Sequence, residues 1–322
     1  MGVRILTGDC RTLLRGLPES SVQCCVTSPP YFGLRDYGVD GQIGLEPTPE
    51  DFVAAMVEVF REVRRVLRDD GTLWLNLGDS YNADGRKGRA HMGEGKNSGY
   101  SGWQNKVGFG TKPKDLLMIP ARVALALQAD GWWLRSDIIW HKPNPMPESV
   151  TDRPTSAHEH VFLLTKNERY FYDADAIREE AVTDDVRRPY GSEGAWQMDG
   201  RDKSKRPNGK ARASDAAGKL RNSRNVWTIA TQPFSEAHFA TMAPDLAERC
   251  IKAGSKQGDT VLDPFGGAGT TGLVADRLNR HAVLLELNPE YAEMAERRIR
   301  SDAGMFASTE RGTSLPAAVA AE

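Results

Sequence analysis

An alternation of apolar strands with an amphipathic helix constrains the fold of this chain more than any other feature. The runs at 22–27 and 72–77 are short and apolar, as buried strands are. Between them, 51–67 repeats apolar residues at steps of three and four, the period of a helix with one buried face. A strand, a crossover helix and a second strand build a parallel sheet. Helical and strand patterns continue at 116–166 and 246–300, so we predict an α/β fold.

Composition limits the class of protein. The chain has 322 residues, of which 39% are hydrophobic and 27% charged, as in an ordinary soluble protein. No apolar run approaches the roughly 18 residues that a membrane span needs, and the first ten residues lack the apolar core of a secretory signal. The four cysteines, Cys10, Cys24, Cys25 and Cys250, show neither a disulfide framework nor metal-ligand spacing. We therefore expect a cytoplasmic protein with reduced thiols, no membrane contact and no metal.

The charge is unevenly distributed along the chain. The formal net charge is only -2, yet 201–224 holds nine Lys or Arg against two Asp. A second segment, 84–112, holds eight glycines and six Lys or Arg. Local basic segments in a near-neutral chain suit contact with a polyanion. A solvated loop is the alternative for both segments.

A glycine-rich turn at 261–272 is the first candidate site. Gly267, Gly269 and Gly272 fit the spacing of a dinucleotide-binding turn, and the lysine of a phosphate-binding P-loop is missing. Asp263 would repel a pyrophosphate but suits a ligand with an ammonium group, such as S-adenosylmethionine. Glu286 ends the next predicted strand, where a carboxylate can accept hydrogen bonds from both ribose hydroxyls. The alternative is that Asp263 only caps the helix.

A second candidate site is the stretch Ser28-Pro29-Pro30-Tyr31, which directly follows the apolar run at 22–27. Two prolines cannot continue a strand ladder, so the chain must form a rigid turn there. Ligands of open α/β sheets bind at the carboxyl ends of the strands. The turn is therefore either a binding element or a simple end to the strand.

Together these motifs resemble the amino-methylating DNA methyltransferases, in particular their permuted beta group, in which the catalytic motif precedes the cofactor motif. Here Ser28–Tyr31 comes first, the basic insertion follows, and 263–271 comes last. The resemblance covers most of 3–175 and 226–300. It implies a Rossmann-like, S-adenosylmethionine-dependent methyltransferase fold: a mostly parallel twisted sheet with helices on both faces, circularly permuted, with an inserted target-recognition region.

The resemblance also implies a division of the chain and its partners. The catalytic half would be 1–173 with its Gly-rich loop 84–112, and the cofactor half 226–301. Between them 174–225 would recognise the target, and 302–322 would be a flexible tail. The expected partner is double-stranded DNA; a homodimer and a cognate restriction endonuclease for the same site are left open.

The family's functional residues map onto matching positions of this chain. The catalytic residues would be Ser28, Pro29, Pro30 and Tyr31. The resemblance implies that the cofactor S-adenosylmethionine is bound by Asp9, Cys10, His238, Phe239, Thr241, Asp263, Pro264, Phe265, Gly267, Gly269, Thr270, Glu286 and Asn288. From their charge, we expect five residues of the insertion to contact DNA phosphates: Lys203, Lys205, Arg206, Lys210 and Arg212.

The expected reaction is methylation of an exocyclic amino group on a base flipped out of the duplex. Ser28 Oγ and the Pro29 carbonyl would accept hydrogen bonds from the amino group, and Tyr31 would stack on the base. Serine at the first position resembles the cytosine-N4 enzymes, whereas Asp or Asn goes more often with adenine-N6, which is the alternative. Cys24 and Cys25 lie within the apolar run rather than at a turn, which disfavours thiolate-dependent methylation at carbon 5.

Other classes of function are disfavoured by particular residues. The intact Ser28–Tyr31 turn disfavours a catalytically idle DNA-binding relative, and together with the basic insertion it disfavours a small-molecule methyltransferase. An RNA methyltransferase stays open as an alternative. Asp263 disfavours a nicotinamide dehydrogenase. His158 and His160 share a strand face but lack a third ligand, so we expect structural or substrate-facing roles.

Overall fold

The computed structural model describes residues 2–82, 112–180, 220–232, 234, 241–303 and 308–313. The chain divides into two compact units. One contains Met1–Asp173 and Arg224–Glu322, and the other is Ala174–Ser223. Each is described separately.

The large unit is built on one nine-stranded sheet in the order β11-β1-β10-β9-β2-β3-β5-β4-β8. All neighbouring pairs are parallel except those of β5, which is antiparallel to both β3 and β4. The strands are β1 (Val3–Thr7), β2 (Val22–Thr27), β3 (Leu67–Leu77), β4 (Trp133–His141), β5 (His158–Thr165), β8 (Val226–Thr228), β9 (Thr260–Asp263), β10 (His281–Glu286) and β11 (Thr309–Gly312). The predicted mostly parallel sheet is confirmed, and the strand order brings the two halves of the sequence together at β2 and β9.

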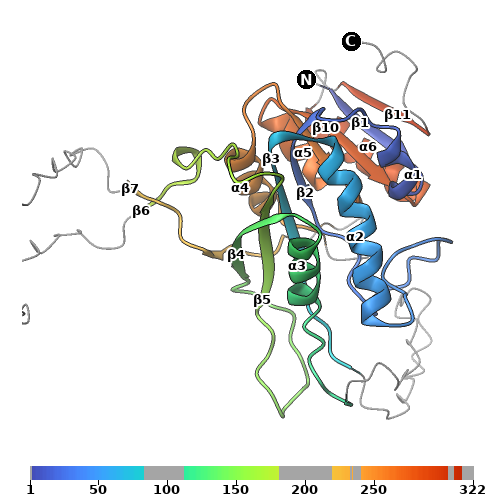
Figure 1. Ribbon diagram of the computed structural model, residues 1–322, viewed down its shortest axis with the longest axis vertical. Helices are drawn as coiled ribbons and strands as arrows, with labels where there is room; N and C mark the ends of the chain where they lie inside the picture. Colours follow the sequence, from blue (N-terminus) through green and yellow to red (C-terminus); the bar gives the residue numbers. More distant parts are fainter. Residues whose placement is uncertain are drawn as a thin grey trace, which may run out of the picture. The chain divides into compact units, whose positions relative to one another are not determined.

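In the described ranges, six helices cover the two faces of this sheet. They are α1 (Cys10–Arg15), α2 (Pro49–Val66), α3 (Ile119–Ala129), α4 (Pro244–Gly254), α5 (Thr270–Arg277) and α6 (Pro289–Ala303). Helix α2 contacts both α1 and α3, and α5 contacts both α4 and α6. Figure 1 shows α2 and α3 in front of the central strands and α4 and α5 behind them. This is the doubly covered α/β arrangement that the alternation of elements predicts.

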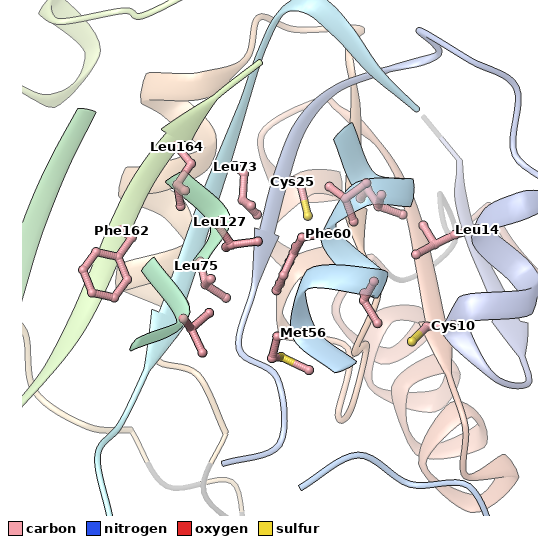
Figure 2. Packing of buried hydrophobic residues seen from close by; sticks show 14 of the residues in the cluster. Cys10, Leu14, Cys25, Met56, Phe60, Leu73, Leu75, Leu127, Phe162 and Leu164 are labelled. Atoms are coloured by element: carbon pink, nitrogen blue, oxygen red, sulfur yellow. The ribbon is translucent and has the colours of Figure 1, made fainter. Parts of the chain in front are cut away.

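The main core lies between the sheet and the first group of helices. Figure 2 shows Met56 and Phe60 of α2 packed near Cys25, Leu73 and Leu75 of the central strands. All four cysteines are buried and unpaired. Burial raises the pKa of the Cys24 thiol to about 12, so it stays a protonated core side chain.

The start of α2 is fixed by local chemistry, but its end is not where the sequence predicts it. Thr48 caps the helix by accepting a hydrogen bond from the Asp51 amide nitrogen at 3.1 Å. The helical period predicts an end at Leu67, four residues before Gly71, whereas the helix ends at Val66 and β3 begins at Leu67. Pairing of Leu67 with Val22 of β2 draws the chain into the sheet before the glycine is reached.

The prediction of a flexible tail at 302–322 is corrected in its described part. Helix α6 extends to Ala303, and Thr309–Gly312 forms the edge strand β11 beside β1. This strand carries no apolar residue, so no hydrophobic pattern marks it. Backbone pairing holds it, with ion pairs from Arg4 to Glu310 and from Arg311 to Glu296.

The small unit is described only in part. It contains a short 3-10 turn at Asp175–Ile177 and a two-stranded antiparallel ladder of β6 (Glu179–Glu180) and β7 (Leu220–Arg221). Arg221 Nε donates to Glu179 Oε1 at 2.9 Å across the ladder. Most of the predicted target-recognition region lies outside the described residues, as does the Gly-rich loop up to residue 111.

Candidate active site

The carboxyl ends of the parallel strands enclose a cavity of about 710 Å³. Strand β2 delivers Ser28, β9 delivers Asp263, β10 delivers Glu286 and β1 delivers Asp9 to this edge. Parallel strands end at a common edge, which is why motifs far apart in the sequence meet there. The volume falls in the range of cofactor sites.

The glycine turn forms one wall of the cavity. Gly267 and Gly269 have φ angles of +49° and +75°, in the left-handed region that favours glycine. A Cβ at Gly269 would lie 2.8 Å from Cβ of Ala295, so α5 and α6 can approach only because the side chain is absent. The Gly266 amide donates to the Leu285 carbonyl at 2.7 Å, which holds the turn against the end of β10.

Asp263 joins the glycine turn to the end of β2. Its Oδ1 accepts hydrogen bonds from Thr27 Oγ1 at 2.7 Å and from the Phe265 amide at 3.0 Å. Its Oδ2 accepts from Thr271 Oγ1 at 2.7 Å. Burial raises the pKa of this carboxyl to about 7, although the two threonine hydroxyls lower it. Asp263 thus lines the cavity and fixes the residue next to Ser28.

Glu286 holds the other side of the same turn. Its Oε2 accepts from the Gly267 amide at 2.7 Å, and its Oε1 accepts from the Asn288 amide at 2.8 Å. A carboxylate offers about four acceptor positions, so unused ones are left beside the cavity. Burial raises the pKa of Glu286 above its ordinary value.

Asp9 and Cys10 line the cavity from the start of α1. Asp9 is the helix cap: its Oδ1 accepts from the Arg11 amide at 2.8 Å, and its carboxylate pairs with the Arg11 guanidinium. Partial burial acts to raise the pKa of Asp9, but the hydrogen bonds from Arg11 outweigh it and leave the pKa lowered. Asp9 is therefore ionised near neutral pH.

The Ser28–Tyr31 turn forms the opposite wall. It is anchored from behind, because Phe32 is buried against Phe52 and its carbonyl accepts from Ser80 Oγ at 2.8 Å. Ring atoms of Tyr31 lie so close to Gly78 that a Cβ there would come within 2.5 Å of Cε2. Ser28 Oγ and Tyr31 Oη lie 3.3 Å apart. The turn is a rigid element of the cavity wall.

Three further polar residues complete this wall, and no sequence motif marks any of them. Asn76 is the next-to-last residue of β3, Glu159 lies on β5 and Lys142 follows β4. Tyr31 Oη donates to Glu159 Oε2 at 2.5 Å, Asn76 Nδ2 donates to the same oxygen at 2.8 Å, and Lys142 pairs with Glu159 Oε1. Strand pairing places Trp140 opposite Glu159, a relation that a single sequence does not reveal.

Most of the predicted site residues meet in this one cavity. Those that line it are Asp9, Cys10, Ser28, Pro29, Pro30, Tyr31, Thr241, Asp263, Pro264, Phe265, Gly267, Thr270, Glu286 and Asn288. Gly269 shapes the turn from outside the lining. The remaining predicted residues, His238, Phe239 and the five basic residues from Lys203 to Arg212, lie outside the described part of the chain.

The histidines beside Glu159 have ordinary partners. His160 Nδ1 lies 2.9 Å from Asp137 Oδ1, and the His160 ring stacks on Phe162. Within the described ranges, no three His, Cys, Asp or Glu side chains are grouped so as to hold a metal ion. A search of the described helices also finds none with the length and apolarity to span a bilayer.

Comparison with known proteins identifies relatives along nearly the whole chain. A family model described as DNA methylase (N6_N4_Mtase) matches residues 22–297. The Type II methyltransferase M.Cfr9I of Citrobacter freundii is 46% identical over 302 residues, which cover 94% of this chain and 89% of that protein. M.SmaI of Serratia marcescens is 45% identical over 296 residues, with coverages of 92% and 90%.

Solved structures share the fold. TTHA0409 from Thermus thermophilus, solved in complex with S-adenosyl-L-methionine, has a TM-score of 0.60 and 26% identity, covering 97% of this chain and 99% of its own. The PvuII DNA methyltransferase, described as cytosine-N4-specific, has a TM-score of 0.61 with coverages of 98% and 96%. At 19% identity, the PvuII likeness supports the fold alone.

Proposed function

The chain belongs to the N6/N4 DNA methylase family and is an S-adenosylmethionine-dependent DNA amino-methyltransferase, and on that premise we propose that it methylates the N4 amino group of cytosine. The observation that carries the proposal is the position of Ser28. Its hydroxyl lies at the carboxyl end of β2, in the cavity that the glycine turn also lines.

The residues of the glycine-turn wall fit S-adenosylmethionine. Its ammonium group suits the carboxylate of Asp263, and its ribose hydroxyls suit the unused acceptor positions of Glu286. The left-handed turn at Gly267 and Gly269 brings backbone close to the cavity without side chains in the way. When bound, the cofactor supplies an electrophilic methyl group on a positively charged sulfur.

The Ser28 wall suits the amino group of a flipped base. That nitrogen is a weak nucleophile because its lone pair is delocalised into the ring. Acceptors on its two hydrogens favour the tetrahedral geometry in which the lone pair is free to attack. Ser28 Oγ and the Pro29 carbonyl are the acceptors that we assign to this role. The nitrogen would gain the methyl group as the bond between that carbon and sulfur breaks, which leaves a neutral thioether, and it would then release one proton to water to restore a neutral amino group.

The choice of cytosine rests on the serine hydroxyl at the first position of the turn. A hydroxyl projects one atom less from the backbone than the Asp or Asn side chain that the resemblance associates with adenine-N6. Adenine-N6 methylation on the same fold is the second candidate, because the family includes both reactions.

We propose that recognition of the DNA substrate depends on the insertion between the two halves of the methyltransferase domain. We assign target recognition to 174–225 and phosphate contacts to Lys203, Lys205, Arg206, Lys210 and Arg212. Replacing these cations should weaken DNA binding and reduce its dependence on salt concentration, since each phosphate contact releases a counterion. An unchanged salt slope would contradict the assignment.

Mass spectrometry of nucleosides tests the proposed function. Genomic DNA of diverse sequence is incubated with the purified protein and methyl-labelled S-adenosylmethionine, then hydrolysed. The proposal predicts labelled N4-methylcytosine with the wild type and almost none with Ser28→Ala. Labelled N6-methyladenine would overturn the cytosine assignment. Equal labelling by both proteins would overturn the role of Ser28.

A further inference from the structure

The proposed function requires Ser28 to act as a hydrogen-bond acceptor, but a serine hydroxyl can donate as well as accept. If its hydrogen pointed into the cavity, it would face the amino hydrogens of the base and oppose binding. Some group must therefore take the hydroxyl hydrogen of Ser28 and leave the lone pairs toward the cavity. Tyr31 Oη lies within hydrogen-bond distance of Ser28 Oγ, at 3.3 Å, and can be that acceptor.

Tyr31 can accept from Ser28 because its own hydrogen is already engaged. Tyr31 Oη donates to Glu159 Oε2 at 2.5 Å. An ionised carboxylate only accepts hydrogen bonds, so the direction of this bond is fixed. Burial and the neighbouring Glu159 raise the pKa of Tyr31 well above its ordinary value, so the phenol keeps its proton.

Asn76 reinforces the same direction. Its Nδ2 donates to Glu159 Oε2 at 2.8 Å and to Tyr31 Oη at 2.9 Å, which uses both amide hydrogens. Its third neighbour, Ser28 Oγ, is farther at 3.3 Å. Among the described residues Asn76 Oδ1 has no hydrogen-bond partner although it is buried, which costs stability. The Asn76 side chain thus keeps its amide hydrogens directed at Glu159 and Tyr31, although this orientation leaves Oδ1 without a hydrogen-bond partner among the described residues.

Lys142 forms an ion pair with the carboxylate of Glu159. The two side chains are only 19% and 14% exposed. Lys142 Nζ also lies 4.6 Å from the centre of the Trp140 ring, whose indole nitrogen donates to the Ile229 carbonyl at 2.8 Å. A partly buried carboxylate with one cation and two hydrogen-bond donors has its acceptor positions well satisfied.

We propose that Glu159 is a positioning residue. It sets the direction of the hydrogen bonds from Ser28 to Tyr31 and from Tyr31 to Glu159, so that Ser28 presents its lone pairs to the amino group. The inference rests on the proposed function, and it assigns roles to Glu159, Asn76 and Lys142 in that same site. Glu159 acts through Tyr31 and Ser28 and does not itself contact the base.

The decisive variant is Glu159→Gln, which keeps the size of the side chain but lets it donate as well as accept. Tyr31 is then free to direct its hydrogen toward Ser28, which occupies a lone pair that the base needs. We expect the initial rate of methyl transfer to diverse genomic DNA, at saturating cofactor, to fall about tenfold with little change in the KM for DNA. Tyr31→Phe removes the intermediate hydroxyl and should produce a similar loss.

A double-mutant cycle separates positioning from a merely structural role. If Glu159 acts through Ser28, then adding Glu159→Gln to Ser28→Ala should change the residual rate by less than about twofold. Calorimetry with S-adenosylmethionine should give wild-type affinity for each variant. Such a result would show that the fold and the glycine-turn wall persist. Asp137→Asn, an exposed carboxylate on β4, is the matched control and should leave the rate unchanged.

Each outcome supports or overturns the inference. A wild-type rate for Glu159→Gln, or an equal fractional loss in the Ser28→Ala background, would overturn it. A loss of cofactor affinity together with the rate would also overturn it, because Glu159 would then support the whole fold. A wild-type protein that methylates no amino group would instead refute the proposed function, so the two failures are distinguishable.

Discussion

The two walls of the cavity are built in different ways. The cofactor wall, which is the wall to which we assign S-adenosylmethionine, is local: Asp263, the glycine turn and Glu286 come from two successive strands and are joined largely by backbone amides. The base wall, which is the Ser28 wall to which we assign the flipped base, is assembled from four separate segments, and side chains make its hydrogen bonds. Because backbone amides hold the cofactor wall together, we expect it to tolerate few changes of backbone conformation. The base wall is a directional network that a single donor or acceptor can reverse.

The largest effect on the cofactor wall should come from Asp263→Asn. The amide keeps the size of the side chain and can still bond Thr27 and Thr271, but it removes the charge that we assign to the ammonium group. We expect affinity for S-adenosylmethionine to fall about thirtyfold, roughly 2 kcal/mol, above neutral pH. Calorimetry measures it. A fall of less than threefold would assign Asp263 to the turn alone.

The wild type should show a matching pH dependence. Because the pKa of Asp263 is raised to about 7, its contribution to apoprotein stability is full below its ordinary pKa and is lost as pH rises through 7. Cofactor binding needs the ionised form, so it depends on pH in the opposite sense. Affinity should fall about tenfold per unit as pH drops below 7. Asp263→Asn should remove this slope; a slope that persists in the variant would show that another group titrates.

Gly78→Ala tests the base wall without altering a polar group. The added Cβ would come within 2.5 Å of Tyr31 Cε2, so the ring and its hydroxyl must move. We expect the single-turnover rate to fall about tenfold, while affinity for the cofactor stays within twofold. Gly2→Ala would place its Cβ no closer than 3.7 Å to a neighbouring atom, and it controls for substitution of a glycine outside the cavity. Equal losses of rate in both variants would show that the effect of Gly78→Ala does not come from displacement of the Tyr31 ring.

The smallest effect should come from Glu286→Gln. One amide hydrogen of the new side chain would face the Gly267 or Asn288 backbone donor, and one acceptor for the ribose would be lost. We expect cofactor affinity to fall about fivefold and the rate at saturation to stay near wild type. A fall in the rate at saturation instead would contradict the separation of the two walls, because Glu286 would then affect the base wall as well as the cofactor wall.

Local chemistry made much of the molecule predictable from sequence. The strand, crossover helix and strand from Val22 to Leu77, and the glycine turn, follow from periodicity and φ requirements within a few residues. The edge strand β11 was missed because its pairing with β1 spans the whole chain and its side chains are polar. The role of Glu159 is not predictable from the sequence, since its proximity to Tyr31 depends on the register of β3, β5 and β4.

Single-turnover methylation by Ser28→Ala, with S-adenosylmethionine titrated, tests the central claim most directly, because one experiment yields both the limiting rate and the cofactor concentration at half saturation. If the base wall acts as a directional acceptor and the cofactor wall is separate, the limiting rate should fall about a hundredfold with half saturation within twofold of wild type. An unchanged limiting rate would contradict the acceptor role of Ser28. A shift in half saturation as large as the loss of rate would contradict the separation of the two walls.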